Sequence, residues 1–348
     1  MGPVAAFREA IRRVNGAPAV VLGMFAATLA VALPLSYVMR STIEAHLGSS
    51  VAADAAAAGV NYDWWQEFSA QASGLATTFI PSIAGFGAVL ENLSNFLDNA
   101  KLTPAITAVT AIWLLTWSFL SGGVIDRFAR ARPTRSHGFF GACGMHVWRL
   151  LRLGLAALAV YAFLFGYVHP WILVDGYGRW TRDFTVERSA FAVRIACYLL
   201  FGTLLIVCNL AFDYARVRIV VEDRRSALGA LLAGARFVRR NPASVLGLYG
   251  LNAVAFVLAV ALYGLAAPGA PRAGWSMWLA LALGEAYILL RHYLKLLFYA
   301  SETVFFQGAL AHAAYTAAPP ILWPDSPAAE TIANADGATT AGMPASER

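Results

Sequence analysis

Only 13% of the 348 residues are charged, whereas 59% are hydrophobic, and the mean hydropathy is +0.60. A soluble domain usually carries about 25% charged residues, so this composition excludes an ordinary water-soluble globular protein. The net charge of +6 is typical of a membrane protein that keeps arginine on one side of the bilayer, and we expect no nucleic-acid partner.

The first elements are a short basic amphipathic segment, residues 1–17, and an apolar run over about residues 18–39. A cleaved signal peptide is the alternative, because Ala30, Val31 and Ala32 resemble a cleavage site. The run is longer than the apolar region of a usual signal peptide. We therefore predict an uncleaved first span.

Residues 41–103 form a loop that is rich in acidic residues and contains one lysine, Lys101. The charge rule for membrane proteins places such a loop on the non-cytoplasmic side, with aromatic residues near Trp64 partly in the interface. Within the loop, residues 75–90 are apolar but are interrupted by Pro81. We predict a re-entrant or surface segment there, and the alternative is a further full span.

Five more apolar runs reach the length that a bilayer requires. They cover approximately residues 104–125, 153–174, 189–212, 243–267 and 275–299. The sequence thus predicts an all-α polytopic transmembrane helix bundle of about six spans, with both termini in the cytoplasm. Residues 18–316 form this membrane domain, and residues 317–348 form an Ala/Pro/Thr-rich tail that we expect to be disordered.

Basic amphipathic segments follow the second and fourth spans, over residues 137–152 and 213–240. In the second of these, Leu228, Leu231 and Leu232 fall on one helical face, which predicts a helix lying on the cytoplasmic membrane surface. Arginines from both regions would form a belt that contacts anionic lipid headgroups. The belt comprises Arg130, Arg132, Arg149, Arg216, Arg218, Arg224, Arg225, Arg236, Arg239 and Arg240. Simple orientation of the protein in the membrane is the alternative role of these arginines.

A possible internal repeat links the two basic regions. Asp126 and Arg130 follow the second span much as Asp213 and Arg216 follow the fourth. Repeated hairpins in parallel orientation occur in transporter-like bundles. Chance similarity between arginine-rich segments is the alternative.

Glu285 and Asn252 are polar residues near the middle of the sixth and fifth spans. A carboxylate at that depth is costly and needs a partner, so we predict that Glu285 and Asn252 face each other. The pair is either a polar clamp between helices or a substrate site. We expect Arg291, His292 and Lys295 to extend toward the interface.

The sequence contains no phosphate-binding loop, nucleophile elbow or zinc-protease motif, and its three cysteines lack the spacing of a metal site. We therefore expect no catalytic residues, metal ligands or cofactors. The protein is expected to be a non-enzymatic scaffold or assembly protein of a bacterial inner membrane that contacts anionic lipid, and a protein partner or a homo-oligomer stays open. A permease-like carrier with its site at Glu285 and Asn252 is the alternative.

The segments DYARVRIVVEDRR (213–225) and RFVRRNP (236–242) resemble uncharacterised bacterial polytopic proteins. Those proteins are similar in style to the membrane domain of some glycerophosphodiester phosphodiesterases. The resemblance covers about residues 100–315 and implies a polytopic membrane fold. It implies no phosphodiesterase activity, because the catalytic domain has no counterpart in this sequence.

Overall fold

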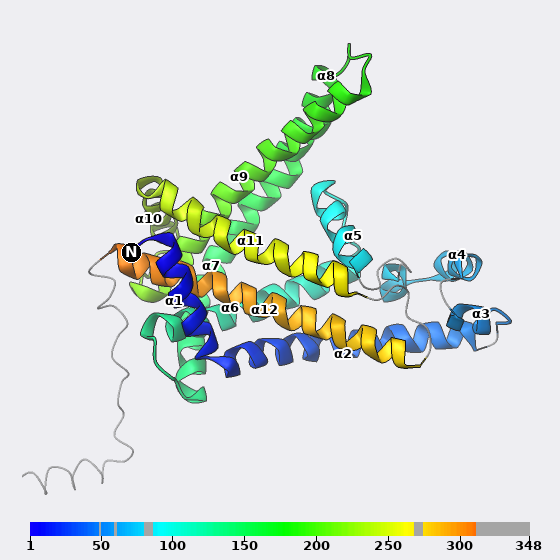
Figure 1. The fold of residues 1–348 in the computed structure, drawn as a ribbon, viewed down its shortest axis with the longest axis horizontal. Coiled ribbons are helices and arrows are strands. Elements are labelled where there is room, and N and C mark those ends of the chain that lie inside the picture. Colours follow the sequence, from blue (N-terminus) through cyan, green and yellow to red (C-terminus); the bar gives the residue numbers. More distant parts are fainter. Residues whose placement is uncertain (49, 59–60, 80–85, 268–273, 311–348) are drawn as a thin grey trace, which may run out of the picture. The chain divides into compact units, whose positions relative to one another are not determined.

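The computed structural model describes residues 1–310 except 49, 59–60, 80–85 and 268–273, and all of its regular elements are helices (Figure 1). The order is α1 (Pro3–Asn15), α2 (Pro18–Leu47), α3 (Ala53–Ala58), α4 (Tyr62–Gln71), the 3₁₀ turn η1 (Gly74–Thr78), α5 (Phe86–Leu97), α6 (Pro104–Arg130), α7 (Ser136–Phe163), the π-helical stretches η3 (Leu164–Val168) and η4 (Trp171–Gly176), α8 (Tyr177–Trp180), α9 (Glu187–Val221), α10 (Ala227–Arg240), α11 (Pro242–Ala266) and α12 (Trp275–Ala309).

Five of the described helices are long and apolar enough to cross a membrane: α2, α6, the continuous stretch from α7 to α8, α9 and α11. They contain the first five predicted spans, which confirms the all-helical prediction and supports the expectation of a membrane protein. Their outer faces carry large apolar side chains such as Leu33, Leu199 and Leu262, which are 62%, 67% and 62% exposed. Apolar surface of this extent is costly in water and is suited to lipid.

Local sequence explains where several of these helices begin. Pro18, Pro104 and Pro242 each occupy the first turn, where the missing N–H of proline costs no hydrogen bond. The Thr103 side chain accepts a hydrogen bond from the Ile106 amide, and Ser226 caps α10 by accepting from the Gly229 amide. These caps satisfy amides that lack a partner inside the helix.

Two predicted boundaries are wrong. The predicted surface helix 137–152 and the span after it form one continuous helix, and α9 runs past Asp213 to Val221. Neither predicted boundary contains a proline, and ion pairs offset the charges. Arg149 bonds Asp223, and Arg218 bonds Glu222 one turn along the chain.

The segment 75–90 is described only in part. It includes η1 and the start of α5 at Phe86, whereas residues 80–85 lie outside the described residues. The end of α5 is fixed to the α7–α9 hairpin, because Asn99 Nδ2 donates to the Phe165 carbonyl at 2.8 Å. The choice between a re-entrant and a spanning segment stays a prediction. The tail 317–348 also lies outside the described residues.

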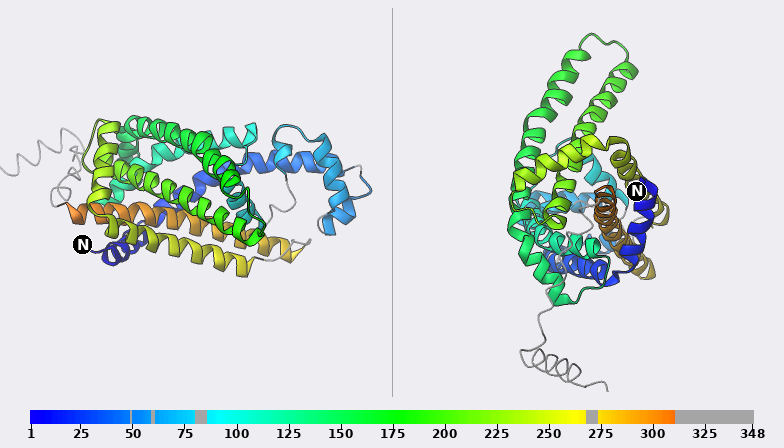
Figure 2. Two further views of the ribbon diagram at one scale, coloured as in Figure 1. Left: turned by 90° about the horizontal axis from the view of Figure 1, so that it is seen from above. Right: turned by 90° about the vertical axis from the view of Figure 1, so that its left-hand side faces the viewer.

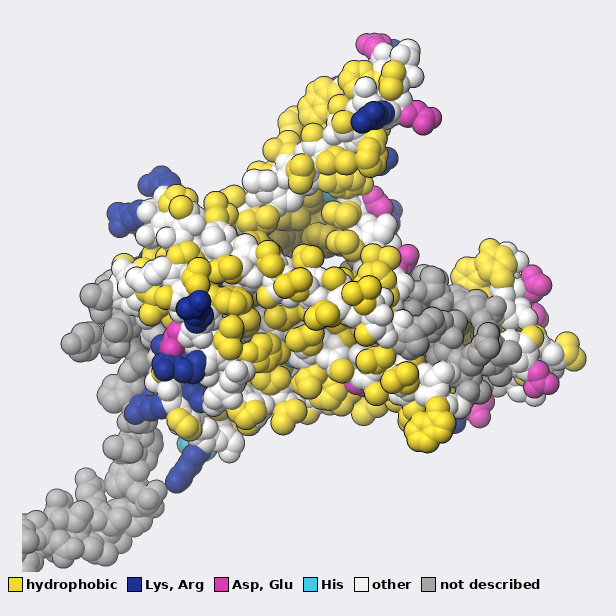
Figure 3. Space-filling model, viewed as in Figure 1, with side chains coloured by type: hydrophobic (Ala, Val, Ile, Leu, Met, Phe, Trp, Pro, Cys, Tyr) yellow, Lys and Arg dark blue, Asp and Glu magenta, His cyan; other side chains and the backbone are white. Residues whose placement is uncertain are grey.

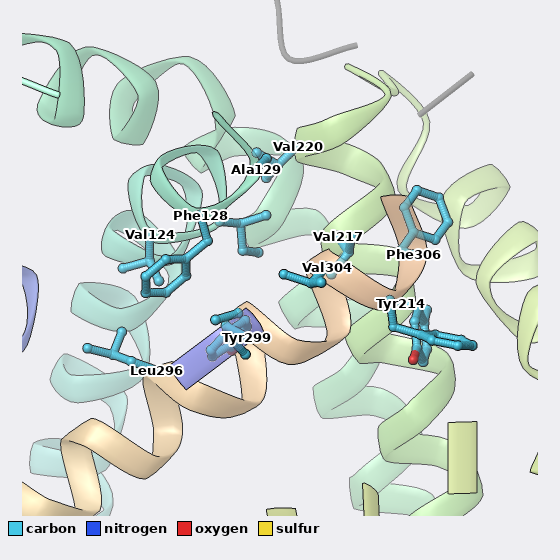
Figure 4. Packing of buried hydrophobic residues seen from close by; sticks show 14 of the residues in the cluster. Val124, Phe128, Ala129, Tyr214, Val217, Val220, Leu296, Tyr299, Val304 and Phe306 are labelled. Atoms are coloured by element: carbon cyan, nitrogen blue, oxygen red, sulfur yellow. The ribbon is translucent and has the colours of Figure 1, made fainter. Parts of the chain in front are cut away.

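The core of residues 1–310 is built around the second half of α12. In Figure 4, side chains from α6, α9 and α12 converge there, including Phe128, Val217 and Val304. Figure 2 places α1, α10 and the end of α12 at the same end of the bundle, while the α7–α9 hairpin diverges from α11 and α12 in Figure 1. The helices are therefore most tightly joined at the end where the arginines lie.

The amphipathic segment at the N-terminus packs on protein. Ala6, Ala10 and Val14 of α1 are buried against the core. Arg13 Nη1 donates to the Phe128 carbonyl at 2.5 Å, and Arg127 Nη2 of α6 donates to the Gly16 carbonyl at 2.9 Å. These bonds tie α1 to α6, so Arg13 has a structural role.

Close approach at glycine joins the two helix pairs of the possible repeat. A Cβ on Gly123 of α6 would lie 2.5 Å from Cys143 Sγ of α7. A Cβ on Gly234 of α10 would lie 2.9 Å from both the Ala211 carbonyl oxygen and the Ala215 nitrogen of α9. Small residues allow such contact between helix backbones in membrane proteins.

Gly234→Ala is expected to push α10 away from α9, because the new methyl group meets backbone atoms that cannot rotate aside. We expect a loss of about 1–3 kcal/mol in unfolding free energy, measured by denaturation of the purified protein in detergent. Gly202→Ala on α9 is the control, since nothing lies within 4 Å of its Cβ position. Equal stability of the two variants would contradict this packing.

Candidate functional site

A cavity of about 490 Å³ lies among α2, α6, α9, α11 and α12. Charged and polar side chains line it, together with Phe256, Leu294 and Phe298. Half of the fourteen lining residues belong to α12, which passes through the centre of the bundle. A polar cavity between helices that face apolar surroundings is where a membrane protein would hold a hydrophilic ligand.

The centre of the site is an ion pair between Asp213 and Arg216, one turn apart on α9. Arg216 Nη1 donates to Asp213 Oδ1 at 2.7 Å and to the hydroxyl oxygen of Tyr299 on α12 at 3.0 Å. The same oxygen accepts from Trp117 Nε1 of α6 at 2.9 Å. Tyr299 therefore connects three helices, and its ring lies in the core beside Leu296 (Figure 4).

Lys295 lies one turn before Tyr299 and faces aromatic rings. Its Nζ is 3.7 Å from the centre of the Trp117 ring and 5.7 Å from that of Trp113. The electron-rich ring faces stabilise the ammonium group without neutralising its charge. The rings hold Lys295 at the cavity wall, where it can bind an anionic group.

Three uncharged residues of the wall, Thr28, His292 and Asn209, are held by side-chain hydrogen bonds. Thr28 Oγ1 of α2 is 2.8 Å from His292 Nε2, and the Tyr161 hydroxyl of α7 donates to Asn209 Oδ1 of α9. The first pair fixes the His292 ring beside Trp113. Side chains from the predicted first, second, fourth, fifth and sixth spans thus meet around one cavity.

The cavity carries more positive than negative groups. Its cationic side chains are Arg216, Arg291 and Lys295, whereas its carboxylates are Asp213 and Glu302. Glu302 is only 4% exposed, and it has no ion pair within 4 Å in the part of the chain that the structure describes. The excess of cationic groups on the wall therefore favours an additional anion.

The predicted pair of Glu285 and Asn252 is not formed. Asn252 Nδ2 donates to Ser301 Oγ at 3.0 Å and to the Leu248 carbonyl. Ser301 lies about 24 Å along α12 from Glu285, at 1.5 Å per residue. Asn252 thus clamps α11 to α12 near the core, and Glu285 Oε2 is buried with no hydrogen-bond partner in the described residues.

The ten predicted headgroup contacts divide into two groups. Arg130, Arg149, Arg216 and Arg218 are tied into the fold by Asp126, Asp223, Asp213 and Glu222. Of these, Arg216 contradicts the prediction most clearly, because it lines the cavity inside the bundle. The other six are exposed: Arg132, Arg224, Arg225, Arg236, Arg239 and Arg240.

Sequence reasoning missed the role of Asp213, Lys295 and Tyr299. The sequence places Lys295 at the interface because it lies near the predicted cytoplasmic end of the sixth span and its long side chain can extend out of the membrane. Helical spacing contained a usable signal, since Arg291, Lys295 and Glu302 fall on one face of α12 at intervals of four and seven residues. The described residues contain no group of three His, Cys, Asp or Glu side chains that could hold a metal ion.

No protein-family model, curated protein or solved structure matches the chain. The resemblance to bacterial polytopic proteins therefore stays an expectation.

Arg216→Met should leave the Asp213 carboxylate without its closest counter-ion. We expect a loss of about 3–5 kcal/mol in unfolding free energy, because an uncompensated charge in the bundle is costly. Adding Asp213→Asn should restore part of it, and a double-mutant cycle by denaturation in detergent measures the coupling. Arg239→Met, at an exposed position of α10, is the control and should change little. Additive effects of the two cavity substitutions would contradict the pair.

Proposed function

We propose that the protein is a six-span membrane protein that binds a small ligand with an anionic group inside its helix bundle, as a carrier does. The observation that carries this proposal is the cavity with Asp213, Arg216, Lys295 and Glu302 on its wall. A purely structural bundle would more economically fill this space with apolar side chains. The carrier hypothesis thus places the ligand site in this cavity and not at Glu285 and Asn252.

The sixth span in this proposal is α12. It is 35 residues long, ample for a bilayer, but Glu285, Arg291 and Lys295 interrupt its apolar run, so it is not among the five helices that are apolar enough by composition. Four of those helices, α2, α6, α9 and α11, pack against it. A polar helix in the middle of a bundle is protected from lipid, so it can cross the membrane while its charges face a cavity.

The charge distribution supports an orientation with the N-terminus in the cytoplasm. In Figure 3, lysine and arginine gather at the end of the bundle near α1 and α10, whereas most acidic side chains lie toward α3, α4 and the tip of the α7–α9 hairpin, which also carries basic side chains. Cytoplasmic ends of membrane helices usually carry the basic residues. In a bacterium this would be the inner membrane.

The wall chemistry favours a ligand with one negative charge. Arg216 presents a guanidinium group that suits a carboxylate or phosphate, and Lys295 adds a point charge nearby. Tyr249 and Asn209 supply hydrogen-bonding groups, while Phe256 and Phe298 supply apolar contact. This set holds and orients a small anion, and the proposal includes no chemical step.

Native mass spectrometry of the protein released from lipid nanodiscs tests this function. We expect a small-molecule adduct on the wild type that Lys295→Met weakens at least tenfold, a loss of about 1.4 kcal/mol or more in binding free energy. Glu285→Gln should retain the adduct, because Glu285 is not part of the cavity wall. An adduct-free wild type that also fails to bind any of a panel of carboxylates and phosphates would refute the proposal.

A second candidate is a scaffold that contacts anionic lipid through α10. Leu228 and Leu232 are 65% and 64% exposed, and the exposed Arg236 and Arg239 follow them on the helix. The buried face of α10 is instead formed by Ala230, Ala233, Gly234 and Phe237 against α9, so the predicted apolar face is only partly the packed one. Exposed leucines beside arginines suit the membrane interface. This arrangement favours lipid partners, and self-association would be compatible with it.

A further inference from the structure

A second pocket lies between the end of α9, α10 and the end of α12, separate from the central cavity. Its volume is about 320 Å³. Four arginines line it. Arg218 belongs to α9, Arg224 lies just after the end of α9, and Arg236 and Arg240 belong to α10. No residue of this pocket belongs to the wall of the central cavity.

Glu222 positions the first two arginines. Arg218 donates two hydrogen bonds to its carboxylate, at 2.9 and 3.1 Å, and Arg224 Nε donates a third at 2.7 Å. Burial acts to raise the pKa of Glu222, but the hydrogen bonds from Arg218 and Arg224 outweigh it and hold the pKa below its ordinary value. The carboxylate is therefore ionised at neutral pH and keeps both guanidinium groups in place.

An aromatic contact adds to this positioning. The Arg218 guanidinium carbon is 5.4 Å from the centre of the Phe306 ring on α12, and the Arg218 side chain is only 12% exposed. A guanidinium group stacked on a ring loses little further freedom when it binds an anion. The Arg218 guanidinium group is thus already held in position before a ligand binds.

The two arginines of α10 have N–H groups that are available to bind a ligand. Arg236 Nε donates to the Leu232 carbonyl at 3.3 Å, and neither Arg236 nor Arg240 has an ion-pair partner in the described part of the chain. Four guanidinium groups therefore line one small pocket, and the Glu222 carboxylate bonds only two of them, those of Arg218 and Arg224. This excess of positive charge at one spot is unfavourable unless an anion occupies it.

We propose that this arginine pocket binds a phosphate group. Guanidinium groups match phosphate oxygens with paired N–H donors, and four of them can serve the several oxygens of one phosphate. The pocket is larger than a phosphate ion alone, and Ala233 and Phe237 supply an apolar side for a substituent. A phospholipid headgroup and a soluble phosphate ester share this chemistry. The proposal stands apart from the ligand of the central cavity.

The matched test compares two double variants that remove the same charge. Arg236→Gln with Arg240→Gln removes the α10 side of the pocket, whereas Arg225→Gln with Arg239→Gln removes two exposed arginines that do not line it. The purified full-length protein is titrated with inorganic phosphate against chloride at equal ionic strength, with its thermal stability as the readout. In parallel, phosphatidic acid adducts are counted by native mass spectrometry from phosphatidylcholine nanodiscs that contain it.

We expect the pocket variant to bind phosphate or phosphatidic acid at least about tenfold more weakly than the wild type, since it loses charge-assisted hydrogen bonds, and the control to change less than about twofold. If the wild type binds inorganic phosphate, the pocket accepts a soluble phosphate ester. If the wild type binds phosphatidic acid but not inorganic phosphate, the ligand is a lipid headgroup. Equal weakening in both variants would show diffuse charge attraction and overturn the proposal, as would a wild type that binds neither probe. Thermal stabilities without ligand establish that both variants fold.

Discussion

Compensation of charge inside an apolar helix bundle is the constraint on which this structure depends. Asp213 and Arg216 on α9 neutralise each other, and Tyr299 of α12 accepts hydrogen bonds from Arg216 and from Trp117 of α6. An isolated charge in such surroundings would be costly, so each partner requires the others. The network fixes three helices at one level. It also explains why α12, whose apolar run is interrupted by charged residues, lies in the middle.

Close backbone contact keeps this network in position. Gly123 lets α6 approach α7, and Gly234 lets α10 approach α9. Because α10 folds back on α9, the arginines after Asp213 lie against protein on one side. That arrangement separates two kinds of basic residue. Those facing helices are paired, as Arg218 is with Glu222, and those facing outward, such as Arg239, are exposed.

Much of the fold could be predicted from the sequence, since each long apolar run imposes a helix of bilayer length and proline fixes several helix starts. The ends of α7 and α9 could not, because ion pairs such as Arg149 with Asp223 bring together residues far apart in sequence. The site was harder to predict for the same reason. Position near the end of the sixth span predicts Lys295 at the interface, whereas its place beside Trp117 depends on how α6 crosses α12. The pairing of Glu285 with Asn252 failed because depth in a span does not define which turns of two helices meet.

Water access to the cavity is the most direct test of the central claim. Tyr249→Cys, in a protein whose Cys143, Cys197 and Cys208 are replaced by serine, places one thiol on the cavity wall. Its reaction with a small charged thiol reagent in nanodiscs would be compared with that of Ala259→Cys, a buried position on the same helix. The account predicts that the first thiol reacts and that the second does not. Equal protection of both would mean that the bundle is closed and that the charges form only a structural clamp.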